Sequence, residues 1–380
     1  MIKSQAVIGC CFGDEGKGKV VSYLCSQSEI KRPLVIRYCG GHQAGHHVVI
    51  DDKCDHVFSN FGSGTLQGVD TYWSEYCTVD PVGIINELIE LKSKLISPYL
   101  YINENCPITT PYEKIANVKA DKLSGHGSVG VGVGQTFQRE EDHYSLTVSD
   151  LFHPKVLRIK LELLRKYYHI ENIDYNNIYE ESIYNFKRSC EKIIDSYYIK
   201  ITNAINVKMY DNFIFEGGQG LLLDQNFGFF PHVTRSNTGT KNILKMGFSP
   251  EIFLVTRAYL TRHGNGPLTN ENIHHSIKDN PYENNSDTSF QGKFRKSILD
   301  LDLIKYAISK DDFIKDSHKQ NKINLVITCL DLIKDDYLLY SNDSVYSFNR
   351  EVDFLNKIKE ELNLTKVYLS KTPYPEMIEG

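Results

Sequence analysis

Short apolar runs, separated by segments with helical spacing and by polar loops, organise this chain. Five runs of four to six residues lie at 6–11, 35–38, 213–216, 252–255 and 325–328. Runs of this length and composition are typical of buried strands in a parallel sheet. Residues 84–96 carry apolar side chains at helical spacing, and 155–208 is polar, tyrosine-rich and largely helical in pattern. The alternation predicts an α/β fold with a central, mostly parallel sheet flanked by helices.

The same pattern bears on domain organisation and on the position of a site. We find no low-complexity linker and no internal repeat, so the simplest interpretation is one domain over 1–380, with 155–208 as a peripheral helical region. Conspicuous polar loops follow the strands at 12–19, 39–47, 216–238, 261–271 and 328–331. Ligands of open α/β sheets bind outside the carboxyl ends of the strands. We therefore expect these loops to converge on one pocket, which favours an enzyme that uses phosphorylated ligands.

Composition narrows the class of protein. The net charge of -5 and the pI near 6.2 argue against a general nucleic-acid binder. The nine cysteines include no C-x-x-C pair, which favours a reducing compartment over a disulfide framework. There is no signal-peptide pattern and no run of about 18 apolar residues, the length that a membrane span needs. We expect a soluble, cytoplasmic protein that binds neither membranes nor nucleic acid.

The glycine-rich stretch 13–19, G-D-E-G-K-G-K, lies between an apolar run and a predicted helix start. Glycines let backbone N–H groups approach an anion closely, and the two lysines add positive charge. The stretch nearly fits the phosphate-binding pattern G-x4-G-K-S/T, but Val20 stands where the magnesium-binding hydroxyl belongs. Asp14 and Glu15 would repel a phosphate unless a metal ion or a proton transfer uses them. An ordinary glycine-rich turn is the alternative.

Six further motifs follow this stretch along the chain. They are G-G-H-Q-A-G-H at 40–46, F-E-G-G-Q-G at 215–220, P-H-V-T-R-S-N-T at 231–238, T-R-H-G-N-G-P at 261–267, T-C-L-D at 328–331 and S-K-T-P at 370–373. Together with G-D-E-G-K-G-K they resemble, in the same order and over essentially the whole chain, the signatures of the adenylosuccinate synthetase family. The first two motifs are highly specific as a pair. The later ones are weak singly and strong as a series.

The resemblance implies a ligase that joins L-aspartate to carbon 6 of a 6-oxopurine nucleotide while a nucleoside triphosphate is cleaved. The 6-oxygen is a poor leaving group, so it is first phosphorylated and then displaced by the amine of aspartate. In this family the residue that matches Asp14 removes the N1 proton, and His46 fits the acid or cation near the γ-phosphate. Lys17 and the loop amides would stabilise the transferring phosphoryl group. For His46 alone, a loop or core histidine is the alternative.

The resemblance also assigns binding roles. Magnesium would bridge the phosphates, with Asp14 and the Gly45 carbonyl as ligands. The other expected contacts to the triphosphate are Gly13, Glu15, Gly16, Gly18, Lys19 and Asp331, the last to the base if that base is guanine. The expected contacts to the purine monophosphate are Gln43, Ser128, Gln219, Thr234, Arg235 and His263, with Gln219 on the purine edge and Thr234 on the phosphate. Arg295 is expected to clamp the carboxylate of aspartate, unless it is a solvated charge in the run 293–296.

Several positions depart from the family pattern. They are Gln43 for Asn, His47 for Thr, Val129 for a phosphate-binding Thr, Tyr144 for an arginine that reaches into a neighbouring subunit, Arg235 for Ser, His263 for a small apolar residue and Cys329 for the Lys that stacks on guanine. These changes concentrate on nucleotide contacts. The pattern looks closer to the short bacteriophage branch, which uses deoxyguanylate (dGMP) to make the precursor of 2-aminoadenine deoxynucleotide. The protein would then act in the cytoplasm of an infected bacterium.

Four alternatives stay open at this point. An adenylosuccinate synthetase that acts on inosine monophosphate (IMP) is the main one, and the phosphate donor is either ATP or GTP. A nucleotide-dependent switch would need a hydroxyl in place of Val20 and the guanine-reading motif N-K-x-D, where only T-C-L-D is present. A catalytically inactive regulator is disfavoured because Asp14, Lys17 and His46 all remain. Family members are usually homodimers, so we expect a homodimer here.

Overall fold

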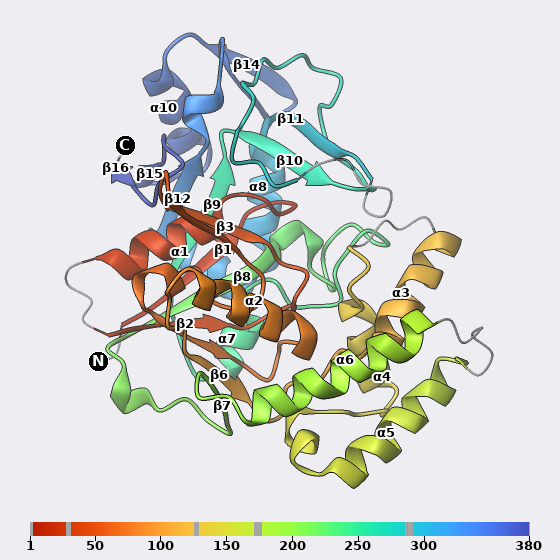
Figure 1. Cartoon of the computed structure of the whole chain (residues 1–380). Helices are drawn as coiled ribbons and strands as arrows, with labels where there is room; N and C mark the ends of the chain where they lie inside the picture. The colour runs from red at the N-terminus through yellow and green to blue at the C-terminus, as the bar shows by residue number, and fades with distance from the viewer. Residues whose placement is uncertain are drawn as a thin grey trace.

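The computed structural model describes residues 3–27, 32–124, 129–170, 177–285, 287 and 292–379, and a ten-stranded sheet runs through its centre (Figure 1). The strands, in spatial order, are β16 (Ile378–Glu379), β15 (Val367–Leu369), β12 (Ile323–Thr328), β9 (Glu251–Arg257), β1 (Lys3–Gly9), β8 (Asn212–Gly220), β2 (Pro33–Arg37), β5 (Asp70–Trp73), β6 (Leu100–Asn103) and β7 (Ile199–Thr202). Neighbouring strands are parallel except β15 and β16. The prediction of a mostly parallel central sheet is confirmed.

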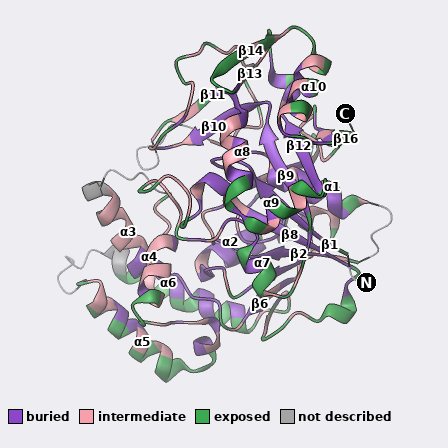
Figure 2. Ribbon diagram, turned by 180° about the vertical axis from the view of Figure 1, so that it is seen from behind, coloured by how far each residue is buried: buried purple, intermediate pink, exposed green. Residues whose placement is uncertain are grey.

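Apolar side chains cover both faces of this sheet, which explains why its strands appear as continuous apolar runs rather than alternating ones. On β1, Ala6 and Ile8 belong to one core, and Val7 belongs to another together with Val20 and Val21 of the first helix. Figure 2 shows the result: the sheet is buried at the centre of the molecule, and exposed residues lie on the surrounding helices.

Ten α-helices lie within the described residues. They are α1 (Lys17–Ser26), α2 (Pro81–Ser93), α3 (Pro111–Ser124), α4 (Val133–Glu141), α5 (Pro154–Tyr167), α6 (Asn177–Ile194), α7 (Lys241–Lys245), α8 (Leu301–Lys310), α9 (Asp312–Lys319) and α10 (Glu351–Glu361). Local sequence sets several starts: Asp80 caps α2 ahead of a proline, and Asp300 accepts the N–H groups of Asp302 and Leu303 at α8. None of the helices in the described part of the chain is long and apolar enough to cross a membrane.

Two smaller sheets complete the described structure. The strands β10 (Tyr259–His263), β11 (Phe294–Asp300), β13 (Tyr337–Ser341) and β14 (Ser344–Phe348) form one of them. The hairpin β3 (His46–Asp51) and β4 (Cys54–Phe58) forms the other. Because β10 follows β9 after a single residue, its far end reaches over the carboxyl edge of the central sheet, where it can contribute to a site.

Described residues of the region 155–208 form α5 and α6, which lie at the periphery of the molecule (Figure 1). Its last part differs from the prediction, because Ile199–Thr202 forms β7 and pairs in parallel with β6 at the edge of the central sheet. No clear pattern predicts this strand, since it is only four residues long and only Ile199 in it is buried. The tyrosine-rich region therefore extends the sheet as well as covering it.

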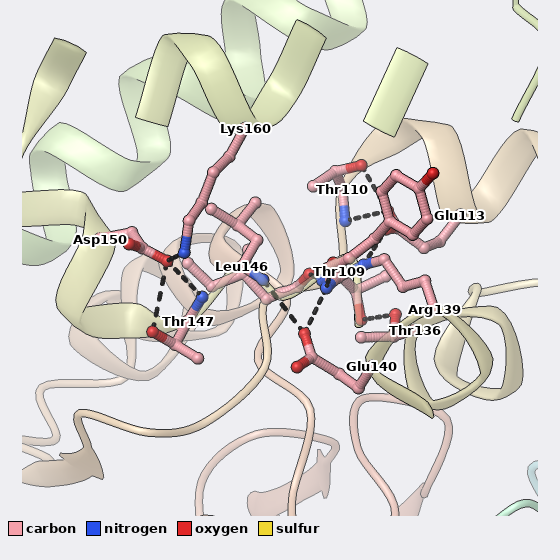
Figure 3. A network of polar contacts seen from close by, with 12 residues as sticks. Thr109, Thr110, Glu113, Thr136, Arg139, Glu140, Leu146, Thr147, Asp150 and Lys160 are labelled. Atoms are coloured by element: carbon pink, nitrogen blue, oxygen red, sulfur yellow. Dashed lines mark hydrogen bonds and ion pairs between the residues drawn. The ribbon is translucent and has the colours of Figure 1, made fainter. Parts of the chain in front are cut away.

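A buried polar network joins α3 to α4 (Figure 3). The Arg139 and Glu113 side chains are fully buried, and Nε of the arginine lies 2.5 Å from the carboxylate. The remaining guanidinium nitrogens bond Glu140 and the carbonyl oxygens of Ile108 and Tyr144. Glu113 also accepts the amide N–H of Thr110. This network fixes the segment after α3, part of which reaches the site described below.

We expect Arg139→Met to lower the free energy of unfolding by about 3–5 kcal/mol, because it leaves the Glu113 carboxylate buried without its cation. The matched control is Arg165→Met, which removes a partly exposed arginine paired with Glu162 and should cost about 1 kcal/mol or less. Urea denaturation of the three proteins measures both values. Equal, small losses in the two variants would show that the buried pair adds nothing to stability.

Candidate active site

The loop between β1 and α1 is built around the buried carboxylate of Glu15. This carboxylate accepts the amide N–H groups of Cys11 at 3.2 Å and Gly13 at 2.9 Å, and the Lys17 ammonium lies 2.6 Å away. Burial alone would raise the pKa of Glu15, but Lys17 and these hydrogen bonds lower it, so the group stays ionised. Glu15 therefore stabilises the conformation of the glycine-rich loop from inside and holds the Lys17 ammonium beside it.

The outer surface of the loop is also fixed. Side chains from three other strands donate hydrogen bonds to three consecutive carbonyl oxygens: Thr261 to Gly13, Arg257 to Asp14 and Thr328 to Glu15, at 3.2, 2.6 and 2.8 Å. The N–H groups in the first turn of a helix have no partner within the helix, so those of α1 are suited to bind an anion. Gly16 precedes α1 with φ at 91°, a conformation that suits glycine.

Asp14 itself has φ at 60°, in the sparsely populated left-handed region. Burial raises the pKa of its carboxyl group, and the charges of Arg257 and Lys17 oppose this rise. Burial also lowers the pKa of Lys19, whose ammonium donates to the carbonyl of Thr372 at 2.8 Å. Burial thus disfavours the charged forms of both groups. A bound cation would stabilise the ionised Asp14 carboxylate, and a bound anion would stabilise the Lys19 ammonium.

His46 begins β3 and lies against Glu216, in the middle of β8. Its Nδ1 is 2.6 Å from the Glu216 carboxylate, which also accepts the hydroxyl and the backbone N–H of Ser63. The other ring nitrogen, Nε2, is buried and has no hydrogen-bond partner among the described residues. Burial lowers the pKa of His46, and the neighbouring Glu216 opposes this effect.

One large cavity lies at the carboxyl edge of the central sheet, with a volume of about 1090 Å³. This exceeds the range of about 300–1,000 Å³ that is typical of a pocket for one small ligand. All five loops expected to converge contribute to its walls, so that prediction is confirmed. Residues within 117–121, 129–135, 280–285 and 372–373 also line it. Position 129 and the motif at 370–373 were among the expected nucleotide contacts, whereas 117–121 and 280–285 carried no signal in the sequence.

The structure brings most of the predicted site residues into this one cavity. Its lining includes Gly13, Asp14, Glu15, Gly16, Lys17, Gly18, Lys19, Gln43, Gly45, His46, Gln219, Thr234, Arg235, His263 and Asp331. Ser128 lies outside the described residues. The specific roles given to these residues stay predictions, because position in a cavity does not by itself assign a contact.

Arg295 is the predicted residue that the cavity lining does not include. Its guanidinium donates to the carbonyls of Gly264 and Gly266 and pairs with Glu271 at 2.9 Å. It therefore supports the loop after β10, in which Asn265 lines the cavity. A clamp on aspartate stays a prediction for Arg295, and in this structure the guanidinium is already bound by the protein.

Sequence reasoning missed Arg257, which ends β9 and lines the cavity. Its guanidinium joins three elements: it donates to the Asp14 carbonyl, to the hydroxyl of Tyr259 and to Glu283, the last at 2.7 Å. One signal for Arg257 was available in the sequence: a positively charged residue directly follows the apolar run 252–255 and Thr256, at the carboxyl end of a strand. Its partner Glu283 carried no signal, because it lies in a polar loop with no motif.

Several polar groups in the cavity await a partner. Both amide atoms of Gln43, the Oε1 of Gln219 and both ring nitrogens of His263 are buried without a hydrogen bond among the described residues. Buried polar atoms are costly when unpaired, so such a group of them is typical of a ligand site.

Arg235 also lines the cavity, but it is half-exposed and pairs with Glu141 at 3.2 Å. Tyr144, the position of the family's intersubunit arginine, packs on Tyr167 and is not part of the lining.

The cavity suits magnesium through its oxygen donors rather than through a preformed cage. Among the described residues no group of three or more histidine, cysteine, aspartate or glutamate side chains is arranged to hold a metal ion. Asp14 and Gly45, from different loops, nevertheless line the same cavity. Magnesium is commonly held by one or two carboxylates together with substrate phosphates, so a carboxylate and a carbonyl beside a phosphate site fit this ion.

Comparison with known proteins places these features in a family. Residues 6–334 match the family model described as adenylosuccinate synthetase. Adenylosuccinate synthetase of Blochmanniella floridana is 32% identical over 296 residues, which cover 71% of this chain and 66% of that protein. Adenylosuccinate synthetase 1 of Pseudoalteromonas translucida is 31% identical over 292 residues, 71% of this chain and 64% of that protein. The chain thus spans slightly less than two thirds of the length of these curated relatives.

Two solved structures have the same fold. The structure of fully ligated adenylosuccinate synthetase from Plasmodium falciparum superposes with a TM-score of 0.78 at 18% identity, over 100% of both chains. Cyanophage S-2L succinoaminodeoxyadenylate synthetase, bound to dGMP and to dATP as an energy donor, superposes with a TM-score of 0.63 at 14% identity, over 100% of this chain and 95% of that one. At these identities the likeness concerns the fold.

We expect Gly18→Ala to destabilise the protein, because an added Cβ would lie 2.8 Å from the Cβ of His46 and 2.9 Å from the hydroxyl of Ser63. The free energy of unfolding should fall by about 1–3 kcal/mol, the usual cost of overpacking. The control is Gly134→Ala, a helical glycine with open space around it, which should be neutral or stabilising by about 0.5–1 kcal/mol. Thermal unfolding measures both, and an unchanged Gly18→Ala protein would contradict the tight packing.

Proposed function

The chain belongs to the adenylosuccinate synthetase family, and on this premise we propose that it is a ligase that joins L-aspartate to carbon 6 of a 6-oxopurine nucleotide. A nucleoside triphosphate is hydrolysed to the diphosphate and phosphate in the same reaction. The observation that carries the proposal is that Asp14, His46, Gln219 and Thr234, from separate loops, line one cavity. Its size suits two nucleotides and an amino acid rather than one small ligand.

In the proposed reaction Asp14 accepts the proton from N1 of the purine, so that the 6-oxygen can attack the γ-phosphorus. The nucleoside diphosphate leaves, and the charge on the transferring group is stabilised by His46, by Lys17 and by the N–H groups at the start of α1. The amine of aspartate then attacks carbon 6, and phosphate leaves with the 6-oxygen. The hydrogen bond from Arg257 to the Asp14 carbonyl, at 2.6 Å, fixes the backbone that carries this carboxylate, which supports the proposed role.

Magnesium is the proposed cofactor, with Asp14 and the Gly45 carbonyl as its protein ligands. The ion would neutralise charge on the phosphate groups during transfer. The proposed role of Asp14 and Gly45 is the same whether the triphosphate is ATP or GTP. Asp331 also lines the cavity, and the charge of Lys19 opposes the rise that burial causes in its pKa. It is the proposed contact to the base of the triphosphate, if that base is guanine.

We favour dGMP as the nucleotide acceptor. Two residues that depart from the family pattern, Gln43 and His263, line the cavity. His263 is proposed to lie at the ribose, where its large side chain suits a nucleotide without a 2′-hydroxyl. The side-chain amides of Gln43 and Gln219 both approach Gly40, since a Cβ added there would lie 3.0 Å from Gln43 Nε2 and 3.1 Å from Gln219 Oε1, and a purine edge is proposed to bind here. The phage structure of the same fold is bound to dGMP, which supports this choice.

IMP is the second candidate. The observation that favours it is sequence similarity, since the curated relatives at 31–32% identity are bacterial adenylosuccinate synthetases. A homodimer is proposed for either substrate from the family alone. The phosphate site of this chain does not need a second subunit in the proposal, because Arg235 of the same chain supplies the cation.

The proposed function is tested by release of inorganic phosphate from ATP or GTP with magnesium and aspartate, comparing dGMP with IMP. We expect turnover with dGMP that depends on aspartate, and Asp14→Asn should lower kcat about 10²–10⁴-fold, the contribution of a general base. The unfolding temperature of Asp14→Asn should match that of the parent protein. Turnover with IMP alone would establish the second candidate, and phosphate release without aspartate would reject the ligase.

Arg235→Ala is expected to weaken binding of the purine monophosphate about 10-fold or more, since a charge-assisted hydrogen bond contributes about 1.5–3 kcal/mol. Binding of the triphosphate should change by less than about twofold in the same calorimetric titration. Glu141→Ala is the control, because it frees Arg235 from its ion pair and should leave monophosphate binding equal or tighter. Equal losses for both nucleotides would remove Arg235 from the phosphate site.

A further inference from the structure

Glu216 takes no part in the proposed bond-making steps, yet its carboxylate is fully buried beside the cavity. It lies on β8, four residues before the strand ends, and faces the start of β3. One carboxylate oxygen accepts from His46 Nδ1, at 2.6 Å, and from the hydroxyl of Ser63, and the other accepts the Ser63 backbone N–H at 3.2 Å. Because three donors bind its two oxygens, the carboxylate is held in one orientation.

The charges around Glu216 keep it ionised. Burial alone would raise the pKa of Glu216, but His46, Arg37 and the Ser63 hydrogen bond lower it. Arg37 is its register partner on β2 and is likewise fully buried. No guanidinium nitrogen of Arg37 has a hydrogen-bond partner among the described residues. The guanidinium lies over the Trp73 ring, 5.6 Å from its centroid, and its charge lowers the pKa of Glu216, so its role here is electrostatic.

An ionised carboxylate can only accept hydrogen bonds, so the proton of the Glu216–His46 contact belongs to Nδ1 of the imidazole. The other nitrogen, Nε2, is then the atom left for the cavity that His46 lines. The space beside His46 is tight, because a Cβ added at Gly18 would lie 2.8 Å from the His46 Cβ and 2.9 Å from the Ser63 hydroxyl. A histidine is oriented in this way wherever a carboxylate binds its second nitrogen.

We propose that Glu216 is a positioning residue, which fixes the tautomer and the direction of His46 so that Nε2 faces the phosphoryl group being transferred. Ser63 holds the carboxylate in place, and Arg37, its register partner on β2, supplies a nearby positive charge. The catalytic part of this inference rests on the proposed function, while the tautomer is a property of the protein without substrates. The two parts are therefore tested by separate measurements.

The tautomer is measured by long-range 1H–15N NMR of the 15N-labelled protein, with the His46 signals identified by their loss in His46→Asn. In the parent protein we expect a protonated Nδ1 and an unprotonated Nε2 for the neutral ring. Glu216→Gln should shift the ring toward the opposite tautomer, because the new amide group can donate to Nδ1. An unchanged tautomer in Glu216→Gln would overturn the proposal, whatever the enzyme activity proves to be.

Kinetics tests the catalytic part. Glu216→Gln should lower kcat about 10- to 100-fold, as for other partners that orient a functional histidine, while KM for the nucleotides changes less than about threefold. Ser63→Ala should lower kcat by a smaller factor, and it carries the test if Glu216→Gln does not fold. Restoration of most of kcat by Glu216→Asp with the original tautomer would support positioning rather than a general structural effect.

Glu87→Gln is the matched control. Glu87 is another buried carboxylate beside a histidine, since His56 Nε2 lies 3.6 Å from it and the N–H groups of Asn60 and Phe61 bond it. It is not part of the cavity lining. We expect this variant to lose stability and to keep the kcat of the parent protein. If Glu87→Gln lowers kcat as much as Glu216→Gln, the loss at Glu216 is structural and the proposal fails.

Discussion

The candidate site depends on the burial of one ionised carboxylate, that of Glu15, beneath the loop it belongs to. Two backbone N–H groups and the Lys17 ammonium converge on this carboxylate, and an added Cβ at Gly9 or Gly220 would collide with it. The loop can therefore take only one path from β1 to α1. Because Glu15 is satisfied inside the protein, Asp14 is the carboxylate of the pair that remains for a substrate or a metal ion.

The same solution recurs at two other places around the cavity. Glu216 ties β8 to β3 and to Ser63, and Glu113 ties α3 to α4. Each of these carboxylates is buried, is bonded by several donors and joins segments that are far apart in the chain. A buried ion pair adds little net stability compared with apolar packing, but breaking one side of it is costly. Such pairs therefore favour one arrangement of the loops over others, which is what a site with several substrates requires.

The sequence predicted the sheet and the edge of the sheet where the site lies, because apolar strand runs and the polar loops after them are local patterns. It could not predict contacts between loops without a pattern. Arg257 and Glu283 are 26 residues apart, and nothing in the segment between them announces their pairing. Arg295 shows the converse: the family resemblance suggested a ligand contact, while the backbone carbonyls of Gly264 and Gly266 bind its guanidinium. Strand β7 was missed because four residues with one buried side chain form it only through β6.

The distribution of altered positions bears on how the monophosphate site is assembled. In the family pattern a neighbouring subunit supplies an arginine at the position of Tyr144, yet here that tyrosine packs on Tyr167 away from the cavity. Arg235 lies in the cavity lining beside Thr234, the proposed phosphate ligand, and its present partner Glu141 is an exposed carboxylate. An exposed ion pair contributes about 1 kcal/mol or less, so a phosphate dianion can displace Glu141 at small cost. On the proposed function, the cation that completes the phosphate site would then come from the same chain, and the site would not need an arginine from a second subunit.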